Sequence, residues 1–530
     1  MIKTDLLLPY RYNTESVKDA ISLILPIEKE EIGEVTLLKR ELVIKEGAAP
    51  KYKATVAFST GEDKEVGLLK IRNRVFPHEP EALSFGKASM DFRPVVVGFG
   101  PAGLFAALAL AESGARPIVI ERGLPIEERR EKVDLFSSLG ILDPECNVQF
   151  GEGGAGTYSD GKLKCGSRDK YKMKVLGELV LAGADESILY SSSAHLGTDK
   201  LPGIVRSVRE KIISLGGEVI FSAKLTDIRL KDGKTESVIY EKNGDTLELE
   251  TQAVILATGH SARDTLLMLK NKGIKMSAKG FGIGVRIEHP REYINKIVYK
   301  DSADIIDETA SYHLVTHLQN GRSVYSFCMC PGGTVVAAAS EYGGIVTNGM
   351  SEYARCADNS NSALLVSVTP VDFASDDPLA GIELQRRIEE RAYRLSGSYR
   401  APSQRLSDLM ENREISTHGS VIPSYPLGTE MIPTREYLPD YVTDSLVASI
   451  EDFDRWMPGF NFGDAVLTGP ETRTTSPVRI ERDSTRECIG FSGIYPAGEG
   501  AGYAGGIVSS AVDGLYVAES IIEKYRAKDN

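Results

Sequence analysis

Apolar and polar residues are arranged in short, distinct blocks over the first part of the chain. Residues 14–25 place an apolar residue at every third or fourth position, which predicts a helix, and Thr14 can cap its start. Three further blocks have the pattern of strands: residues 2–8, 35–44 and 51–58. The mostly polar segments 74–80 and 85–92 are typical of a linker. We therefore expect a small N-terminal α/β module over residues 1–90.

The pattern sharpens after Arg93. An apolar run at 94–97 has the length of a buried strand, and Gly98, Gly100 and Gly103 follow it at once. The next residues have an apolar helical face that ends near residue 114. A first glycine permits a tight turn, a second allows a pyrophosphate to approach the backbone, and a third lets helix and strand pack closely.

A second apolar run, 117–120, ends at Glu121. A carboxylate at the end of this strand can accept both ribose hydroxyls of an adenosine and would repel a 2′-phosphate. Strand, glycine-rich turn, helix, strand and terminal acid in this order predict a dinucleotide site, with phosphates bound at the N-terminus of the helix. The alternative is a glycine-rich turn without a ligand.

The remainder of the chain divides by its periodicity. Helical residues 205–215 precede a predicted strand over 217–230 and a predicted meander over 231–259. Residues after about 271 are less periodic, and no helix pattern follows the glycines of 280–288, so we expect no second nicotinamide domain. A helix is predicted at the C-terminus. The predicted domains are residues 1–90, a split domain of 91–270 and 465–530, and an inserted domain of 271–464.

The segment "FGEGGAGTYSDGKL", residues 150–163, spells two phosphate-binding patterns at once. A nucleoside-triphosphate loop needs Ser or Thr after Lys162 to hold Mg²⁺, and Leu163 cannot do so. A dinucleotide turn needs a surrounding βαβ unit, which is missing here. We interpret the segment as a backbone-rich loop over the pyrophosphate or the flavin edge, with Ser159 and Lys162 as the side chains expected to contact it.

Two later motifs bear on which dinucleotide binds. An apolar strand leads into Ala-Thr-Gly at 257–259, and a short strand, an acid and a glycine-rich turn precede the C-terminal helix over 493–521. This order resembles the glutathione-reductase-type FAD superfamily. More narrowly, the motifs "NVQFGEGGAGTYSDGKL", "FCMCPGG", "ETRTTSPVRIER" and "YPAGEGAGYAGGI" resemble the bacterial NAD(FAD)-utilising dehydrogenases over nearly the whole chain.

The resemblance implies FAD as the cofactor and a set of residues that bind it. The glycines of the first turn would hold the pyrophosphate, Glu121 the adenosine ribose, and the strand around Leu225 would pass the adenine. Glu499 stands where the superfamily usually has Asp against the ribityl chain. The implied cofactor-binding set is Gly98, Gly100, Pro101, Ala102, Gly103, Glu121, Arg122, Ser159, Gly161, Lys162, Leu225, Thr258, Gly259, Gly498, Glu499, Gly505, Gly506 and Ile507.

A helix that starts after Gly505-Gly506 would stabilise the negative charge that reduced flavin carries. The glycines allow the backbone to come that close. The alternative is a packed C-terminal helix after a flexible loop.

Three residues are candidates for catalysis, each with a structural alternative. Cys328 and Cys330 would share one face of a strand, where buried structural thiols are the alternative to a thiol that faces the substrate. Tyr503 either stacks on the flavin or donates a proton, or is a plain loop aromatic. No metal site is predicted, because His313 and His317 lack a third ligand.

The arginines of "ETRTTSPVRIER" are Arg473, Arg479 and Arg482. One of them is a candidate to face an anionic substrate or the flavin. We expect surface ion pairing for at least two of them.

Composition narrows the functional class. The 530 residues carry a net charge of −13 and no long basic tract, which disfavours nucleic acid as a partner. No apolar run reaches the ~18 residues that span a bilayer, and six cysteines in so long a chain do not make a disulfide framework. We expect a cytoplasmic α/β protein: a Rossmann-like FAD-binding domain split in sequence, an inserted mixed α+β substrate domain, and the N-terminal module.

The predicted activity is that of an FAD-dependent oxidoreductase that exchanges a hydride with an organic small molecule, with NAD(P)H as a possible electron donor. Three alternatives remain open from the residues. They are an NAD-dependent dehydrogenase without flavin, a flavin-bound RNA-modifying or RNA-binding protein, and a non-catalytic FAD-binding scaffold.

Overall fold

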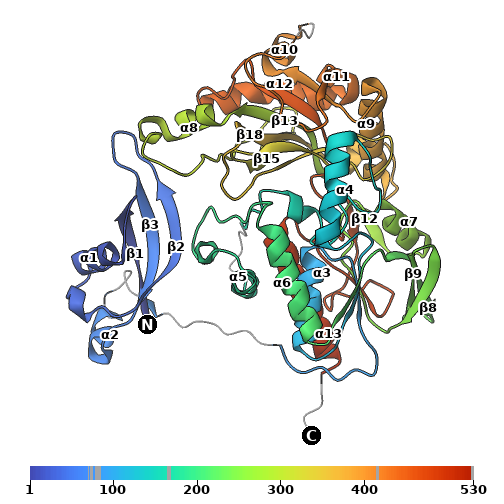
Figure 1. Cartoon of the computed structure of the whole chain (residues 1–530), viewed down its shortest axis with the longest axis horizontal. Coiled ribbons are helices and arrows are strands. Elements are labelled where there is room, and N and C mark those ends of the chain that lie inside the picture. Colours follow the sequence, from blue (N-terminus) through green and yellow to red (C-terminus); the bar gives the residue numbers. More distant parts are fainter. Residues whose placement is uncertain (70, 72–75, 78–84, 164–168, 414–416, 527–530) are drawn as a thin grey trace.

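The structure, a computed structural model, describes residues 1–69, 71, 76–77, 85–163, 169–413 and 417–526. It is a mixed α/β protein in which a small N-terminal sheet, a parallel sheet with its helices, and a larger mostly antiparallel sheet lie in three regions (Figure 1).

The N-terminal region contains one sheet with strand order β2-β3-β1-β4 and two helices. The three predicted strands and the predicted helix are confirmed, but Asn13 rather than Thr14 caps the helix, because its side chain accepts the Ser16 N–H at 2.9 Å. The second helix was not predicted. The linker predicted at 74–80 lies mostly outside the described residues. The elements are β1 (Ile2–Pro9), α1 (Thr14–Ile24), β2 (Val35–Val43), β3 (Lys51–Phe58), α2 (Glu62–Leu69) and β4 (Phe76–Pro77).

The N-terminal sheet contacts the rest of the molecule at two separate places. The Arg40 N–H donates to the carbonyl of Tyr190 at 2.7 Å, and the guanidinium of Arg40 lies over the Tyr190 ring. The hydroxyls of Tyr10 and Tyr52 both donate to the carboxylate of Glu308. The sheet is therefore attached to both larger regions of the chain.

A five-stranded parallel sheet forms the second region, in the order β23-β11-β5-β6-β7. The predicted strand, helix and strand after Arg93 are confirmed as β5, α3 and β6. Helices α3, α6 and α13 lie together beside the sheet (Figure 1). The elements are β5 (Val95–Val97), α3 (Pro101–Glu112), β6 (Ile118–Ile120), α4 (Ile126–Leu139), α5 (Lys172–Leu181), α6 (Leu201–Ser214), β7 (Glu218–Ile220), β11 (Val254–Leu256), α7 (Arg263–Asn271), β23 (Ile494–Pro496) and α13 (Ile507–Lys524).

Close packing of α3 on α13 depends on one glycine. A Cβ at Gly514 would lie 2.1 Å from the Ala102 carbonyl oxygen, so no larger residue fits without separating the helices. This contact brings the C-terminal helix, which begins more than four hundred residues later in the chain, against the helix of the first glycine-rich turn.

The strand predicted over 217–230 is two strands in different sheets. Strand β7 ends at Ile220, and Ser222 has a φ of 53°, which turns the chain into the separate meander of β8, β9 and β10. The alternation of apolar residues continues across the turn, so the periodicity did not reveal it. The bounds are β8 (Lys224–Lys231), β9 (Lys234–Lys242) and β10 (Asp245–Glu250).

The third region is a seven-stranded sheet in the order β14-β15-β18-β13-β21-β19-β20. Helix α12 packs on this sheet, and Ile283, Val285 and Ile287 of β13 belong to the apolar core there. The alternate positions Arg286 and Glu288 are buried and charged. The strands are β13 (Phe281–Pro290), β14 (Val315–His317), β15 (Ser323–Cys330), β18 (Asn359–Val368), β19 (Ala401–Arg405), β20 (Thr429–Met431) and β21 (Val466–Glu471).

Two findings differ from the predicted boundaries. Strand β21 lies in the seven-stranded sheet, although its residues fall in the segment predicted to return to the first domain. Helix α8 follows β13 directly, so the expectation that no helix follows this segment is wrong. The glycines of 280–284 lie at the start of β13 or within it, and they do not form a glycine-rich turn before the helix. The other elements are β12 (Met276–Ala278), α8 (Arg291–Tyr299), β16 (Thr334–Ala337), β17 (Thr347–Met350), α9 (Ala380–Ser396), α10 (Leu406–Glu411), α11 (Thr434–Tyr437), α12 (Asp440–Trp456) and β22 (Val478–Ile480).

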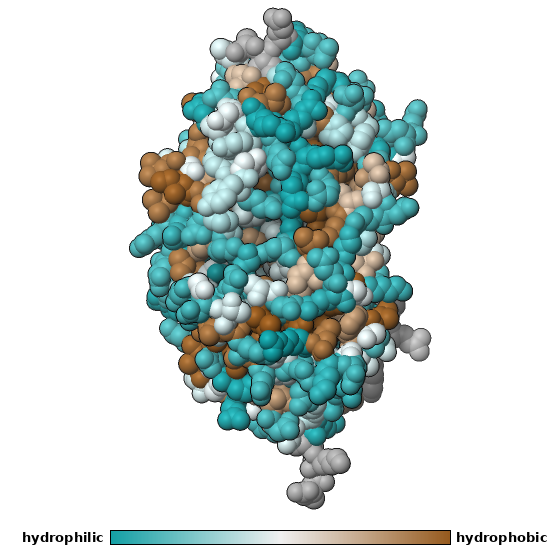
Figure 2. Space-filling model, turned by 90° about the vertical axis from the view of Figure 1, so that its right-hand side faces the viewer, coloured by the Kyte–Doolittle hydropathy of each residue, from teal (hydrophilic) through white to brown (hydrophobic). Residues whose placement is uncertain are grey.

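The surface seen in Figure 2 is mainly hydrophilic, with hydrophobic side chains in separate patches. Within the described parts of the chain, no helix combines the length and the apolar character needed to cross a membrane.

Candidate functional site

The first glycine-rich turn has the geometry of a phosphate-binding turn. Gly98 has a φ of +93°, and a Cβ at Gly103 would lie 2.0 Å from the Gly98 carbonyl oxygen, so both positions require glycine. A Cβ at Gly100 would meet only the Cα of Gly154, at 3.7 Å. Helix α3 begins at Pro101 without a side-chain cap, which leaves its first N–H groups available to an anion.

Glu121 clamps the backbone rather than pointing freely into solvent. Its buried carboxylate accepts the N–H groups of Phe99 at 2.8 Å and of Gly123 and Gly151 at 2.9 Å each. Three of its four acceptor positions are thereby filled. One acceptor position remains, so Glu121 cannot accept two ribose hydroxyls in this arrangement as the sequence analysis expected.

Arg129 on helix α4 holds the loop that begins after residue 146. Its side chain is fully buried and donates five hydrogen bonds of 2.6–3.3 Å to backbone carbonyls between residues 147 and 154. The sequence analysis missed this residue. A signal existed, because Arg129 shares the helix face of Ile126, Val133 and Phe136, which are buried. The carbonyl acceptors are those of Asn147, Val148, Gly151, Glu152 and Gly154.

The loop of residues 150–163 touches both glycine-rich helix starts. A Cβ at Gly156 would lie 3.2 Å from Ile507 at the start of α13 and 3.7 Å from Pro101 at the start of α3. Gly506 is the N-terminal cap residue of α13, and no side chain caps the start of this helix. The start of α3 is likewise without a side-chain cap. Two helix N-termini and a loop rich in backbone N–H groups therefore converge.

The Ala-Thr-Gly strand end and the C-terminal motif meet beside this point. A Cβ at Gly98 would lie 3.1 Å from the Cα of Thr258, and a Cβ at Gly500 would lie 2.5 Å from the carbonyl carbon of Gly259. A Cβ at Gly498 would lie 2.6 Å from the Cβ of Ala102. Four sequence motifs spread over four hundred residues thus form one site.

Glu499 and His260 face each other in that site, with 4.0 Å between Oε1 and Nε2. Burial raises the pKa of Glu499 to about 7, against a smaller opposing effect of Lys279. Burial, together with Arg473 and Arg263, lowers the pKa of His260 to about 3. The histidine is therefore neutral near pH 7, and the carboxyl group titrates there.

Ser159 and Lys162 have different surroundings. The Ser159 hydroxyl donates to the Gly156 carbonyl at 2.7 Å and accepts the Gly161 N–H at 3.1 Å, so it shapes the loop itself. The Lys162 ammonium donates to the carbonyl of Met329 in β15. Lys162 therefore reaches from this loop to the seven-stranded sheet.

The two cysteines of β15 do not share a face. The register with β18 shifts between Phe327 and Cys330, and Cys328 has a φ of +39°. Cys330 is buried and its thiol donates to the Cys328 carbonyl, whereas the Cys328 side chain is accessible. The bulge separates side chains that an unbroken strand would align.

Three further residues that the sequence analysis named as site candidates make contacts within the protein. The Tyr503 hydroxyl donates to the Ile480 carbonyl at 2.9 Å, and Arg482 covers its ring at 3.6 Å, which favours the interpretation as a loop aromatic. Leu225 is buried in the core. Arg122 pairs with Glu145 and Asp264.

The arginines of residues 471–482 do not behave as one surface group. Arg473 is buried and pairs with Glu389 and Glu341, which corrects the expectation of surface ion pairing. Arg482 pairs with Asp513, and Arg479 lies over the ring of Tyr503.

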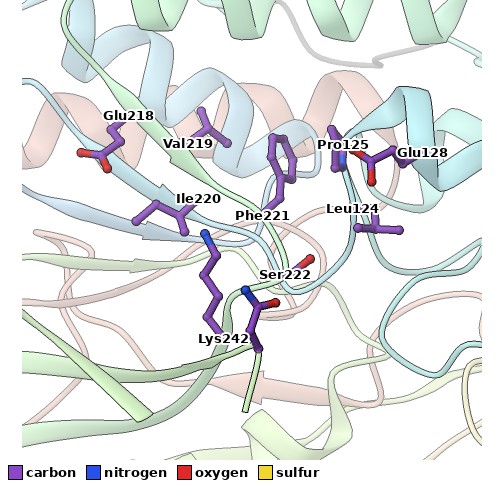
Figure 3. A pocket seen from close by; sticks show the side chains of 10 residues that line it. Leu124, Pro125, Glu128, Glu218, Val219, Ile220, Phe221, Ser222 and Lys242 are labelled. Carbon is purple, nitrogen blue, oxygen red and sulfur yellow. The ribbon is translucent and has the colours of Figure 1, made fainter. Parts of the chain in front are cut away.

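A recess of about 480 Å³ opens next to the end of β6 and along β7 (Figure 3). The Phe221 ring in its wall lies edge-on to Phe99 of the first glycine-rich turn, with 6.3 Å between ring centroids. Ser222 donates its N–H to the Gly123 carbonyl at 2.9 Å, which ties the recess to the segment after Glu121. The lining residues are Leu124, Pro125, Glu128, Glu218, Val219, Ile220, Phe221, Ser222, Lys242 and Asn243.

These residues fit an elongated dinucleotide with a central anionic group. The uncapped start of α3 and the open space at Gly100 suit a pyrophosphate, and the exposed Gly505 and Gly506 admit a flat ring against the start of α13. In the described residues, no group of three or more His, Cys, Asp or Glu side chains is placed to hold a metal ion.

Comparison with solved structures gives matches over most of the chain at low identity. One match is a quinol fumarate reductase of E. coli, with 14% sequence identity and a TM-score of 0.33. The match covers 84% of this chain and 72% of the reductase chain. A second match is a glycerol-3-phosphate dehydrogenase of Bacillus halodurans complexed with FAD, with 10% sequence identity and a TM-score of 0.36. The match covers 84% of this chain and 66% of the dehydrogenase chain. A third match is a 3-ketosteroid dehydrogenase of Rhodococcus jostii, with 13% sequence identity and a TM-score of 0.36. The match covers 84% of this chain and 100% of that chain. TM-scores this low support no conclusion about activity.

Sequence comparison is more informative. Residues 280–474 match the family described as FAD-dependent protein, C-terminal domain-like. An uncharacterized protein of Clostridium beijerinckii is 47% identical over 517 residues, which cover 94% of each chain. The chain therefore belongs to the same family as the Clostridium protein, and the match of residues 280–474 to a domain of FAD-dependent proteins supports FAD as its cofactor.

Proposed function

We propose that this protein is an FAD-dependent oxidoreductase that exchanges a hydride between the flavin and an organic small molecule. The observation that carries the proposal is the convergence of two uncapped helix N-termini on one glycine-rich loop, which itself reaches the seven-stranded sheet. The proposal includes membership of the glutathione-reductase-type superfamily. It also includes a split FAD domain with an inserted substrate domain.

The chain's own residues would place the cofactor in an extended form. The N-terminus of α3 with Gly98, Gly100 and Gly103 would bind the pyrophosphate, and the recess beside Phe221 would take the adenine end. Glu499 would hold the ribityl chain, with Thr258 and Gly259 beside it. Of the loop residues, we propose that Ser159 and Gly161 contribute through the loop backbone.

When bound, FAD supplies two-electron hydride exchange. The N-terminus of α13 would stabilise negative charge placed against Gly505 and Gly506. His260, neutral near pH 7, offers an acceptor beside the carboxyl group of Glu499. The wall formed by Cys328 and Met329 would bound the substrate from the seven-stranded sheet. An electron source other than NAD(P)H is proposed, with transient binding of NAD(P)H by the flavin face as the alternative.

Anaerobic titration of the purified protein tests this function. The expected result is bound FAD that NADH, NADPH or a member of a metabolite panel reduces, with a second compound that reoxidises it. Protein without flavin absorbance that oxidises substrates with NAD would favour the flavin-free dehydrogenase. Bound flavin that no compound reduces or reoxidises would favour a scaffold, and a basic groove that binds RNA would favour an RNA-modifying role.

A further inference from the structure

Lys162 is an enclosed cation without a carboxylate partner among the described residues. Its ammonium group donates to the Met329 carbonyl, and none of the ion pairs formed by the described residues includes it. The nearby Asp160 is paired with another cation, because it accepts from Arg355 at 2.5 and 2.9 Å and from Ser351 at 2.8 Å. Burial lowers the pKa of Lys162, opposed by Asp160.

Within the part of the chain that the structure describes, the cations near Lys162, namely Arg286 and Arg355, are paired with carboxylates. Arg286 is fully buried and pairs with Glu471 at 2.6 and 2.8 Å, and it also donates to the Cys328 carbonyl at 2.9 Å. Arg355 pairs with Asp160. Each of these arginines is thus matched by a carboxylate, and Lys162 is the cation of this cluster that has no carboxylate partner among the described residues.

The charge lies where a small molecule can reach it. The Cys328 side chain is accessible, yet burial raises the pKa of its thiol to about 12. The Lys162 side chain itself is half-buried. Lys162 reaches the next residue of the bulge, Met329, from the loop that touches both helix N-termini.

We propose that Lys162 binds a carboxylate group of the substrate, beside the exposed Cys328. An ammonium group has three donors, and one of them is used by Met329, so two remain for an anion. A single negative charge matches the single unpaired positive charge. A phosphate dianion would need further donors, and the guanidinium groups of Arg286 and Arg355 are already taken by carboxylates. The inference rests on the proposed function.

Titration of the FAD-loaded protein with acetate, succinate and benzoate tests this site. We expect saturable binding by at least one of them, read from the flavin absorbance and from the thermal unfolding midpoint. Lys162→Met should weaken it at least ten-fold, whereas Lys162→Arg, which keeps the charge, should stay within about three-fold. Lys53→Met, an exposed lysine of β3, is the control.

Methylthiolation of the Cys328 thiol, which forms a mixed disulfide and releases methanesulfinate, gives a readout that does not depend on the flavin. The bound carboxylate should slow modification of Cys328 by methyl methanethiosulfonate in a Cys356→Ser background, as mapped by mass spectrometry, and Lys162→Met should remove this protection. Equal carboxylate binding and protection in Lys162→Met would overturn the proposal. A second result would also overturn it: the parent protein binds no carboxylate, and Lys162→Met loses FAD. In that case the charge of Lys162 would hold the cofactor and not the substrate. A flavin that no compound reduces, with carboxylate protection intact, would contradict the proposed activity alone.

Discussion

The carboxylate of Glu121 accepts the N–H of Gly151 at 2.9 Å and so joins the two glycine-rich segments of the chain. The same carboxylate holds the turn at Phe99 and the segment at Gly123. Glu121 therefore joins three backbone segments of the proposed cofactor site.

Glu121→Gln should weaken both stability and FAD binding. The new amide group is a donor where the carboxylate oxygen accepted one or two N–H groups, so buried donors lose their partners. We expect the free energy of unfolding to fall by about 2–4 kcal/mol, since hydrogen bonds to charged groups contribute roughly 1.5–3 kcal/mol each. Urea unfolding and the FAD content of purified protein measure the effects. Glu210→Gln, an exposed carboxylate of α6, should be neutral.

Arg129→Lys should loosen the loop of residues 147–154. A lysine has three donors and cannot reproduce five hydrogen bonds from a planar guanidinium. We expect a loss of about 3 kcal/mol or more in the free energy of unfolding, with faster FAD dissociation. The neighbouring Arg130→Lys is the matched control, because its side chain is 80% exposed and pairs only at the surface with Asp134. Equal effects of the two variants would contradict the role assigned to Arg129.

Gly100→Ala and Gly103→Ala should separate binding from folding. The nearest atom to a Cβ at Gly100 is 3.7 Å away, so the methyl group fits the protein and costs less than about 1 kcal/mol, but it occupies the approach of a pyrophosphate. A Cβ at Gly103 would lie 2.0 Å from a carbonyl oxygen and should prevent stable folding. Isothermal titration with FAD should show at least ten-fold weaker binding to a well-folded Gly100→Ala protein. Unchanged affinity would place the pyrophosphate elsewhere.

Glu152 makes stability depend on pH. Burial raises its pKa to about 7, and one carboxylate oxygen has no hydrogen-bond partner. Between pH 4.5 and 7 the unfolded chain loses this proton while the folded protein keeps it, so the free energy of unfolding falls as pH rises. Glu152→Gln cannot titrate, so its stability relative to the parent should rise by about 2–3 kcal/mol over this range. Denaturant unfolding from pH 4.5 to 8 measures the difference.

A control keeps the Glu152 result specific. Glu131→Gln removes an exposed carboxylate of the same helix, α4, and is the matched control over the same pH range. A flat difference for Glu152→Gln would mean that Glu152 is ionised throughout.

Local rules account for the parts that could be predicted from sequence. Strand β5, the glycine-rich turn, α3 and β6 follow from apolar run lengths, helical period and the steric freedom of glycine, all of which act over a few residues. The same rules placed the C-terminal helix. They missed the helix cap by one residue at Asn13, because Asn and Thr are both good caps and only the backbone geometry decides between them.

Tertiary contacts decided the rest of the site. The face of Cys328 depends on a bulge that forms only when β15 pairs with β18, and the partner of Lys162 lies 167 residues away. The burial of Arg129 depends on a loop that folds back over α4. By itself the sequence determined where the glycine-rich turns lie and which strands and helices flank them, because those properties are local. Only the tertiary structure decided which charges are paired and which side chains face one another, because distant segments supply their partners.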